Sequence, residues 1–258
     1  MFPRFFYPNL FLFFLFNFLG ATTYYVDKNG NDNSDGSQNS PWLTISKAAE
    51  TLVAGDTVIV GPGIYRERVV PANSGTDTEP IVYWTDPTDR AVISGADILT
   101  GWTQCSADDV PGNSNYASIY YTDIDWEPTY LLEDQKRLRK TKEPASSWWE
   151  ADTSTELTLT DQNNLYGADD FWVGSELVLW YVAGGGRSYY EIIDYDAATH
   201  TITVAETLSN SWQASKDRYC IQNCLATIRP GEWAIRPLGN QQYRIFIYPS
   251  AGDLPTDH

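Results

Sequence analysis

Two short apolar patterns recur in the first third of the 258-residue chain, each about 23 residues after its first copy. Val58–Val60 is followed by Ile81–Tyr83, and Val69–Val70 is followed by Val92–Ile93. The turn-forming sequences GPG, PANSGTDTE and DPTDR separate these segments. A repeat of this length is typical of solenoids, whose coils pack only on their neighbours. The pattern therefore predicts that residues 57–94 form parallel strands stacked with right-handed coiling.

A short amphipathic helix is expected before the first coil, over residues 45–53. Thr44 or Ser46 can cap its start, and Gly55 can end it. Its apolar residues at helical spacing are Ile45, Ala48, Ala49, Leu52 and Val53. Such a helix would cover the open end of the coil stack and shield the apolar core and the unpaired strand edge from water.

After Gly101 the pattern changes to longer alternating runs, which are typical of antiparallel strands. One of them, IIDYDAATHTITV, indicates a hairpin with its turn at Asp194–Thr199. We expect residues 102–236 to form an inserted antiparallel β barrel or sandwich with its own core. Residues 22–101 then form the cap and the first coils, and residues 237–258 a return strand toward a truncated β-helix. The overall prediction is a mainly β protein.

Residues 1–21 have the features of an export signal peptide. Arg4 is the only charged residue before Asp27, and the apolar run Leu10–Leu19 has the length of a signal-peptide core. A membrane-spanning helix needs about 20 apolar residues, and Asn17 interrupts any longer count. An uncleaved membrane anchor is the alternative. The sequence thus predicts no stable membrane span, and a protein that is secreted, or held at a bacterial cell surface or in the periplasm.

Charge and cysteine content narrow the function classes further. The chain has 34 acidic and 17 basic side chains, a formal net charge of −17, which argues against nucleic acid as a partner because a polyanion is repelled. The spacing of Cys220 and Cys224 is not that of a redox or zinc pair. With Cys105 as the third cysteine, buried thiols are favoured, and one disulfide stays open in an oxidising compartment.

An ordered set of short motifs runs through residues 24–97. It consists of Tyr25-Val26, Asp35-Gly36, Pro41-Trp42, Thr44-Ile45, Ala48, Gly55-Asp56-Thr57-Val58, Pro62-Gly63, Tyr65 and Glu67. In this order the motifs resemble the N-terminal cap and first coils of right-handed parallel β-helix proteins of the pectate-lyase-like superfamily, which usually have Thr where this chain has Ser37. Thr129–Lys140 and Pro230–Pro249 are similar to segments of a β-rich domain that many such proteins carry between early coils.

The resemblance implies that a long β-helix resumes after Pro249, so that this chain is the N-terminal part of a secreted carbohydrate-active protein. Such proteins act on polysaccharide as lyases, by β-elimination, or as glycoside hydrolases. The lyases use a base, usually Lys or Arg, and often carboxylate-bound calcium, and the resemblance places both on later coils. We therefore assign no catalytic residue, metal or cofactor to this chain, and expect calcium only in the full-length protein. The alternative is a non-catalytic glycan-binding, adhesin-like or scaffold β-helix surface protein; the oligomeric state is left open.

Candidate substrate-binding residues come from a basic run, KRLRKTK, and from a tryptophan pair. They are Lys136, Arg137, Arg139, Lys140, Trp148 and Trp149. The cationic groups pair with the carboxylates of anionic sugar chains, and indole faces stack on sugar rings. The alternative for the run is a solvated edge strand whose charges prevent edge-to-edge pairing. Because adjacent strand residues point to opposite faces, at least one tryptophan is expected in the core.

Other chemically suggestive residues carry less information. Asp27–Asp35 has oxygen ligands at the first, third and fifth positions of a calcium loop, but Asp32 and Gln38 stand where the loop requires Gly and a bidentate Glu. A solvated loop is therefore favoured. Neither His200 nor His258 has an obvious partner for a catalytic triad, and 34 acidic residues do not single out a glycosidase pair.

Overall fold

The computed structural model describes residues 20–209, 212–214 and 216–251, so all but the last two residues of the expected export signal lie outside the described part. The chain divides into two compact units between Asp97 and Ile98. Strands far outnumber helices among the described residues, which confirms a mainly β protein. None of the described helices is long and apolar enough to cross a membrane.

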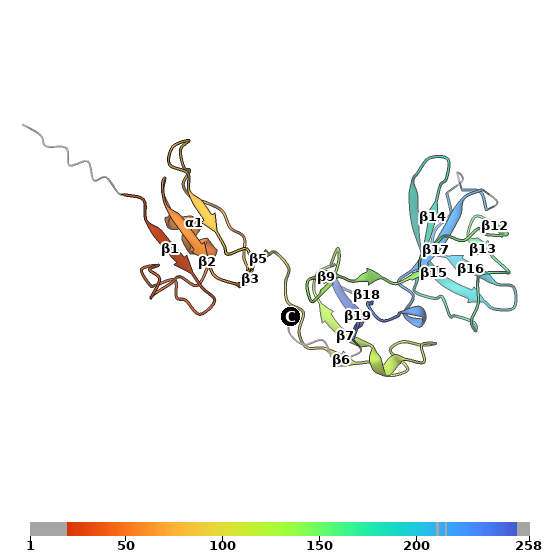
Figure 1. Ribbon diagram of the computed structural model, residues 1–258. Coiled ribbons are helices and arrows are strands. Elements are labelled where there is room, and N and C mark those ends of the chain that lie inside the picture. Colours follow the sequence, from red (N-terminus) through yellow and green to blue (C-terminus); the bar gives the residue numbers. More distant parts are fainter. Residues whose placement is uncertain (1–19, 210–211, 215, 252–258) are drawn as a thin grey trace, which may run out of the picture. The chain divides into compact units, whose positions relative to one another are not determined.

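The first unit contains two small parallel sheets (Figure 1). β1 (Thr23–Val26), β2 (Thr57–Val60) and β4 (Val82–Trp84) form one sheet, and β3 (Gly63–Arg66) pairs with β5 (Ala91–Ser94) in the other. Parallel partners must be joined by long crossover connections. The chain therefore alternates between the two sheets, and the expected parallel pairing within residues 57–94 is confirmed.

The offset between paired strands differs from the expected 23 residues. Val58 of β2 lies opposite Tyr83 of β4, 25 positions later, and Ile64 of β3 lies opposite Val92 of β5, 28 positions later. The partners expected from apolar likeness are therefore wrong. Backbone hydrogen bonds set the register of a ladder, and the offsets on the two sides of the coil differ, so no single period applies.

β3 ends at Arg66, and the residue that follows it contacts the helix α1 (Ile45–Thr51). The Glu67 carboxylate accepts hydrogen bonds from the backbone amides of Ile45 (3.0 Å) and Ser46 (2.6 Å). Amides in the first turn of a helix have no partner within the helix. The side chain that follows β3 therefore holds the start of α1, and the expected short helix at this place is confirmed.

The remaining acceptors at the start of α1 come from the preceding loop. The Thr44 hydroxyl accepts a hydrogen bond from the Lys47 amide (3.0 Å), as a cap residue does. The Asp32 carboxylate accepts bonds from the amides of Leu43 (2.8 Å) and Thr44 (2.9 Å) and from the Thr44 hydroxyl (2.9 Å). The carboxylate of Asp32, in the calcium-like loop Asp27–Asp35, thus binds backbone amides just before α1.

The core of the first unit joins β1, β2, β3 and α1. Its buried members are Val26, Trp42, Ile45, Ala48, Leu52, Val58, Val60 and Tyr65. The last strand of the larger sheet, β4, behaves differently: its residues Val82, Tyr83 and Trp84 are 37%, 38% and 47% exposed. Among the described strands β4 pairs only with β2, so this edge is apolar and open.

The second unit contains two larger sheets (Figure 1). The five-stranded sheet has the order β10 (Arg139–Lys140), β18 (Glu232–Gly239), β19 (Gln242–Tyr248), β7 (Tyr120–Ile124) and β6 (Thr103–Gln104). The seven-stranded sheet has the order β11 (Lys142–Glu143), β17 (Arg218–Gln222), β14 (Glu176–Trp180), β15 (Arg187–Asp196), β16 (Thr201–Val204), β13 (Thr158–Thr160) and β12 (Thr153–Ser154). A hairpin of β8 (Leu132–Glu133) and β9 (Lys136–Arg137) and two 3-10 turns, Tyr116–Ser118 and Leu225–Thr227, complete it.

All strand pairs in this unit are antiparallel except β10 with β18, so the expected antiparallel unit and its β15–β16 hairpin are confirmed. Its extent differs from the expected division. The unit begins at Ile98 rather than at residue 102, and β19 pairs with β18 and β7 inside the five-stranded sheet. The described part of residues 237–258 is therefore sheet of the second unit and not a separate return strand, because Ile245 and Ile247 are buried in its core.

A buried carboxylate lies in the core of the seven-stranded sheet. Asp161 has no exposed surface and accepts hydrogen bonds from the Tyr219 hydroxyl (2.7 Å) and from the backbone amides of Asn163 and Asn164 (both 3.0 Å). Burial raises the pKa of Tyr219, which keeps its hydroxyl a donor. A buried charge is stable only when its lone pairs are bonded in this way.

We predict that Glu67→Ala lowers the free energy of unfolding of the first unit by about 1–2 kcal/mol, because two helix amides lose their acceptor. Urea unfolding of wild type and variant checks this, together with hydrogen exchange of the Ile45 and Ser46 amides, which should accelerate. Glu50→Ala, on the exposed side of the same helix, is the matched control. Equal destabilisation by both variants would contradict the prediction.

Candidate functional site

The four basic candidates lie on two different elements. Lys136 and Arg137 form β9, and the turn before them places Asp134 and Gln135 at positive φ. Both cationic residues are exposed, and the Arg137 guanidinium lies 5.2 Å from the centroid of the Tyr130 ring. This hairpin is the most accessible part of the basic run.

The other two basic candidates are held by the protein itself. Arg139 lies 3.7 Å from the carboxylate of Glu232, which is buried, and burial raises the pKa of that carboxyl group. The Lys140 ammonium lies 5.6 Å from the centroid of the buried Trp233 ring. Because Leu138 between the two pairs is also buried, the run does not form one continuous basic surface. Arg139 and Lys140 are therefore both engaged by groups of the protein, although the Arg139 side chain is 69% exposed.

The tryptophan pair divides between core and surface. Trp149 packs against Trp172, with ring centroids 6.3 Å apart, and against Tyr219 at 5.6 Å, and both of these are fully buried. Trp148 lies among half-exposed and exposed residues instead, 5.4 Å from Trp180. The expectation that at least one tryptophan belongs to the core is confirmed, and Trp149 is that residue.

Two cations lie over the Trp148 ring. The Lys142 ammonium is 4.5 Å from its centroid and the Arg187 guanidinium 5.2 Å. The Lys142 ammonium also donates a hydrogen bond to the carbonyl oxygen of Ser147 (2.7 Å). Cations above an indole face are attracted by the ring's electron density. Trp148 thus fixes the positions of two positive charges from separate strands.

The register of the seven-stranded sheet shows which residues share this surface. Trp180 lies between its cross-strand partners Arg187 and Arg218, and Val178 lies between Tyr189 and Cys220. Cross-strand partners share a face, and alternate residues of a strand return to it. Lys142 joins the same face through its pairing with Gln222 on β17. The opposite face carries the core residues Leu177, Leu179, Tyr219 and Ile221.

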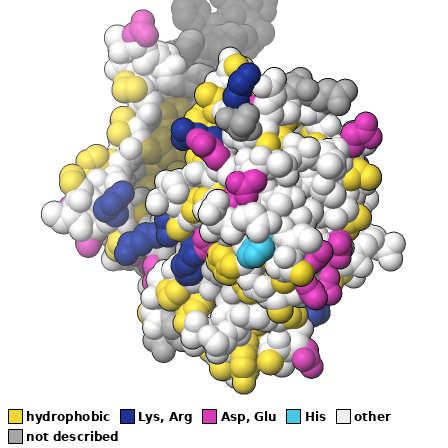
Figure 2. Space-filling model, turned by 90° about the vertical axis from the view of Figure 1, so that its right-hand side faces the viewer, with side chains coloured by type: hydrophobic (Ala, Val, Ile, Leu, Met, Phe, Trp, Pro, Cys, Tyr) yellow, Lys and Arg dark blue, Asp and Glu magenta, His cyan; other side chains and the backbone are white. Residues whose placement is uncertain are grey.

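We call this surface the aromatic–cation face. It consists of Lys142, Trp148, Trp180, Arg187, Tyr189 and Arg218. Val178 and Cys220 have no exposed surface although they lie on this side of the sheet, which fits a cover formed by Trp148. Figure 2 shows that Lys and Arg side chains lie beside hydrophobic ones on part of the surface in that view.

The charges on the face are only partly neutralised. Arg218 lies 3.5 Å from Glu150, and both side chains are well exposed. Neither Lys142 nor Arg187 has a carboxylate within 4 Å among the described residues. Open aromatic rings stack on the apolar faces of sugars, and free cations pair with carboxylates or other anions. The face thus offers groups of the kinds that contact sugar rings and anions.

Sequence reasoning found only part of this face. Trp148 was a candidate and Lys142 belongs to the basic run. The other members of the face, Trp180, Arg187, Tyr189 and Arg218, were not among the candidates. The alternation in RSYYEIIDYD places Arg187 and Tyr189 on one side of β15, and this was the available signal. Which side faces outward depends on pairing with β14 and β17.

The remaining titratable candidates are hydrogen-bonded, buried or outside the described residues. His200 contacts the carbonyl oxygen of Leu165 through Nδ1 (2.6 Å), and His258 lies outside the described residues. Cys105, Cys220 and Cys224 are free and buried, as favoured, and burial raises the pKa of Cys220 to about 12. Such a thiol is not a nucleophile at neutral pH.

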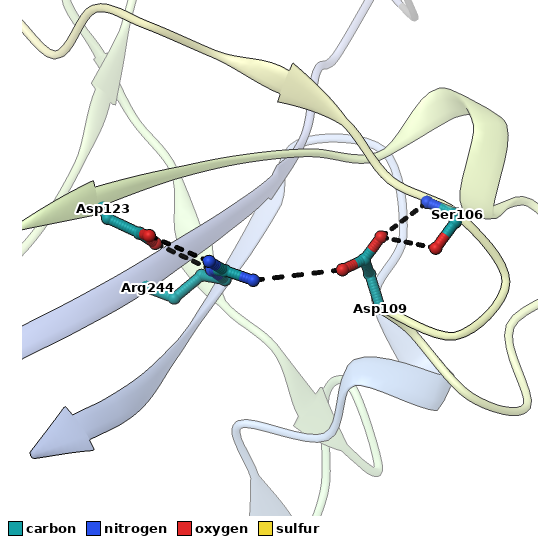
Figure 3. A network of polar contacts seen from close by, with 4 residues as sticks. All are labelled: Ser106, Asp109, Asp123 and Arg244. Carbon is teal, nitrogen blue, oxygen red and sulfur yellow. Dashed lines mark hydrogen bonds and ion pairs between the residues drawn. The ribbon is translucent and has the colours of Figure 1, made fainter.

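A polar network fastens β7 to β19 (Figure 3). The Arg244 guanidinium donates two parallel hydrogen bonds to the Asp123 carboxylate (2.7 and 2.8 Å) and lies 3.9 Å from Asp109. Asp109 also accepts bonds from the amide (2.8 Å) and hydroxyl (2.6 Å) of Ser106. These hydrogen bonds hold the pKa values of Asp123 and Asp109 below their ordinary range. Both carboxylates are thus ionised and paired, which suits a fastening and not an acid catalyst.

Comparison with known proteins identifies relatives for parts of the chain. Residues 28–71 match a family described as "Protein of unknown function (DUF1565)". The "Uncharacterized protein YwoF" of Bacillus subtilis (strain 168) is 36% identical over 74 residues, which make up 29% of this chain and 16% of that protein. The matched relative is thus much longer than the matching segment.

A solved structure described as a "Glycoside hydrolase" is similar over 92% of this chain, with a TM-score of 0.61 at 16% identity. This chain covers 45% of that structure. The structure described as "The complex structure of XylC with xylose" gives a TM-score of 0.35 at 18% identity. That match covers 81% of this chain and 32% of the XylC chain. The first likeness shows the fold: this chain shares a mainly β architecture with somewhat less than half of that protein.

We predict that Arg244→Gln lowers the free energy of unfolding at neutral pH by about 1 kcal/mol or less, because the Asp123 side chain is 46% exposed and the pair is screened. Because the pKa of Asp123 is lower in the folded protein than in the unfolded chain, where it is about 3.9, its ionisation stabilises the folded state at pH values above about 3.9. This stabilisation is lost as the pH falls through the folded-state pKa. The difference between wild type and variant should therefore vanish in acid. Urea unfolding from pH 7 to pH 3 checks this, with Lys136→Gln as control; a difference independent of pH would contradict it.

Proposed function

We propose that this chain is the N-terminal part of a secreted, carbohydrate-active β-helix protein of the pectate-lyase-like type that acts on polysaccharide. In this proposal the first unit begins a right-handed β-helix capped by α1, and the second unit is a β domain inserted before the helix continues. Lyase or glycoside hydrolase chemistry, with calcium where a lyase requires it, belongs to later coils. Residues 1–21 direct export.

The single observation that carries the proposal is the open edge of the first unit. Val82, Tyr83 and Trp84 of β4 are apolar and exposed, whereas the other end of the core is covered by α1. Solenoid coils bury their apolar faces only against neighbouring coils. An apolar, unpaired strand edge is a surface that natural proteins cover. A further coil stacked on β4 supplies that cover.

Two other findings support the carbohydrate assignment. The solved structure with a TM-score of 0.61 is described as a glycoside hydrolase, and this chain covers 45% of it. The fold likeness leaves more than half of that protein for further coils. In addition, the aromatic–cation face presents aromatic rings and cations of the kinds that contact sugars.

We predict that this 258-residue chain does not cleave polysaccharides. Its first unit offers about two coils, and strands spaced about 4.8 Å apart make that wall roughly 10 Å tall, too short to grip several sugar units. The test is to incubate the purified chain with pectate, alginate, xylan and chondroitin, with and without calcium. Neither new unsaturated ends absorbing in the ultraviolet nor new reducing ends should appear.

The matched experiment uses a longer reading frame that continues past residue 258. Under the proposal this longer protein produces one of those two kinds of ends from at least one polysaccharide. Cleavage by the 258-residue chain would place a complete active site within it and contradict the prediction. A longer protein that binds but never cleaves would favour the non-catalytic surface β-helix.

A further inference from the structure

We propose that the aromatic–cation face binds the carboxylate-bearing sugar units of an acidic polysaccharide. That the ligand is a carbohydrate rests on the proposed function, whereas the preference for carboxylates comes from the face itself. The roles divide among its residues. Lys142 and Arg187 pair with carboxylates, Trp148 positions these two cations, and Tyr189 stacks on a sugar ring.

The division of roles follows from which rings are free. Lys142 and Arg187 both lie over Trp148, at 4.5 and 5.2 Å from its centroid, so this ring is already engaged. Trp180 is half-buried and packs against Trp148 at an angle of 46°. Tyr189 is 53% exposed, and no cation or ring is recorded over it in the described part of the chain. Tyr189 therefore offers the open aromatic surface.

The row of charges gives the face its polarity. Arg187, Trp180 and Arg218 form one row across three adjacent strands, β15, β14 and β17. With strands about 4.8 Å apart, this row spans roughly 10 Å, which limits the contact to a short segment of a sugar chain. At the far end of the same strands Glu191 and Glu176 lie opposite each other. An acidic chain is thus attracted to the arginine end. The backbone of Lys142 pairs through Gln222 with the row of Glu176 and Glu191, but its ammonium lies over the Trp148 ring, which the Arg187 guanidinium also contacts.

Local charge is decisive because the whole chain repels anions. Because this chain has a formal net charge of −17, an acidic polymer can bind only where the cations of the protein are not already neutralised by carboxylates. Lys142 and Arg187 meet this condition among the described residues, whereas Arg139 is paired with buried Glu232 and Arg218 with Glu150. A planar guanidinium binds a carboxylate through two parallel hydrogen bonds. Lys142 and Arg187 are therefore expected to dominate the affinity.

The experiment measures binding of the full chain to polygalacturonate, a carboxylated polymer, by affinity electrophoresis and calorimetry. A neutral β-glucan, chondroitin sulfate and single-stranded DNA are the comparison ligands. We expect Arg187→Gln and Lys142→Gln each to weaken polygalacturonate binding about threefold to tenfold, since a factor of ten corresponds to about 1.4 kcal/mol. Raising the salt concentration should weaken it as well. Tyr189→Ala should weaken binding, and Tyr189→Phe should restore it.

Lys136→Gln is the matched control, because it removes the same charge from the exposed β8–β9 hairpin. An equal loss with Lys136→Gln places binding on the basic run and overturns the proposal. Equal affinity for the neutral β-glucan overturns the carboxylate preference, equal affinity for DNA shows a general anion surface, and no binding at all also overturns it. Tighter binding of chondroitin sulfate than of polygalacturonate assigns the site to sulfate. Circular dichroism of each variant confirms that it is folded.

The outcome is separable from that of the proposed function. A longer protein that cleaves polysaccharide while its aromatic–cation face binds nothing contradicts only the binding site. Binding of polygalacturonate that depends on Arg187 and Lys142, in a longer protein without activity, contradicts only the enzymatic proposal.

Discussion

Carboxylates that accept backbone hydrogen bonds are the interaction on which the first unit depends. α1 has only seven residues, and an isolated helix of that length does not form in water. It is held because Glu67 binds its first two amides and Asp32 binds the amides just before it. Asp56, which is buried, likewise accepts hydrogen bonds from the amide of Thr22, just before β1, and from the amide of Val53, shortly after α1. These bonds act together with the apolar contacts by which Ile45 and Ala48 of α1 pack into the core of the first unit.

The same device recurs in the second unit, which gives the acidic composition a structural role. Asp161 joins Tyr219 to two loop amides, and Asp217 accepts bonds from the amides of Val182 and Gln213 (both 2.9 Å). Some of the 34 acidic residues of the chain are therefore buried and accept hydrogen bonds from backbone amides. This explains why counting acidic residues could not identify a catalytic pair. Several buried carboxylates stabilise the fold through hydrogen bonds to the backbone.

The two units expose different kinds of surface. The first ends in an apolar strand edge that invites a further coil, and the second presents a sheet whose outer face carries aromatic rings and free cations. The Trp148 ring joins two strands that are not neighbours in this sheet, because Lys142 of β11 and Arg187 of β15 both lie over it although they are 45 positions apart in the sequence. The surface exists only when both strands have found their places in the seven-stranded sheet.

The sequence by itself determined the mainly β character, the short helix that begins after Thr44, the change from parallel to antiparallel strands near residue 100, and the burial of one tryptophan of the pair. These follow from local periodicity and capping chemistry, which neighbouring residues decide. Strand register, the place of β19 and the membership of the aromatic–cation face did not follow, because they depend on pairings between distant segments. Apolar likeness suggested Ile81 as the partner of Val58, but backbone hydrogen bonds placed Tyr83 there. Only the tertiary structure decided which of the basic residues are neutralised by buried carboxylates and which are left free to bind.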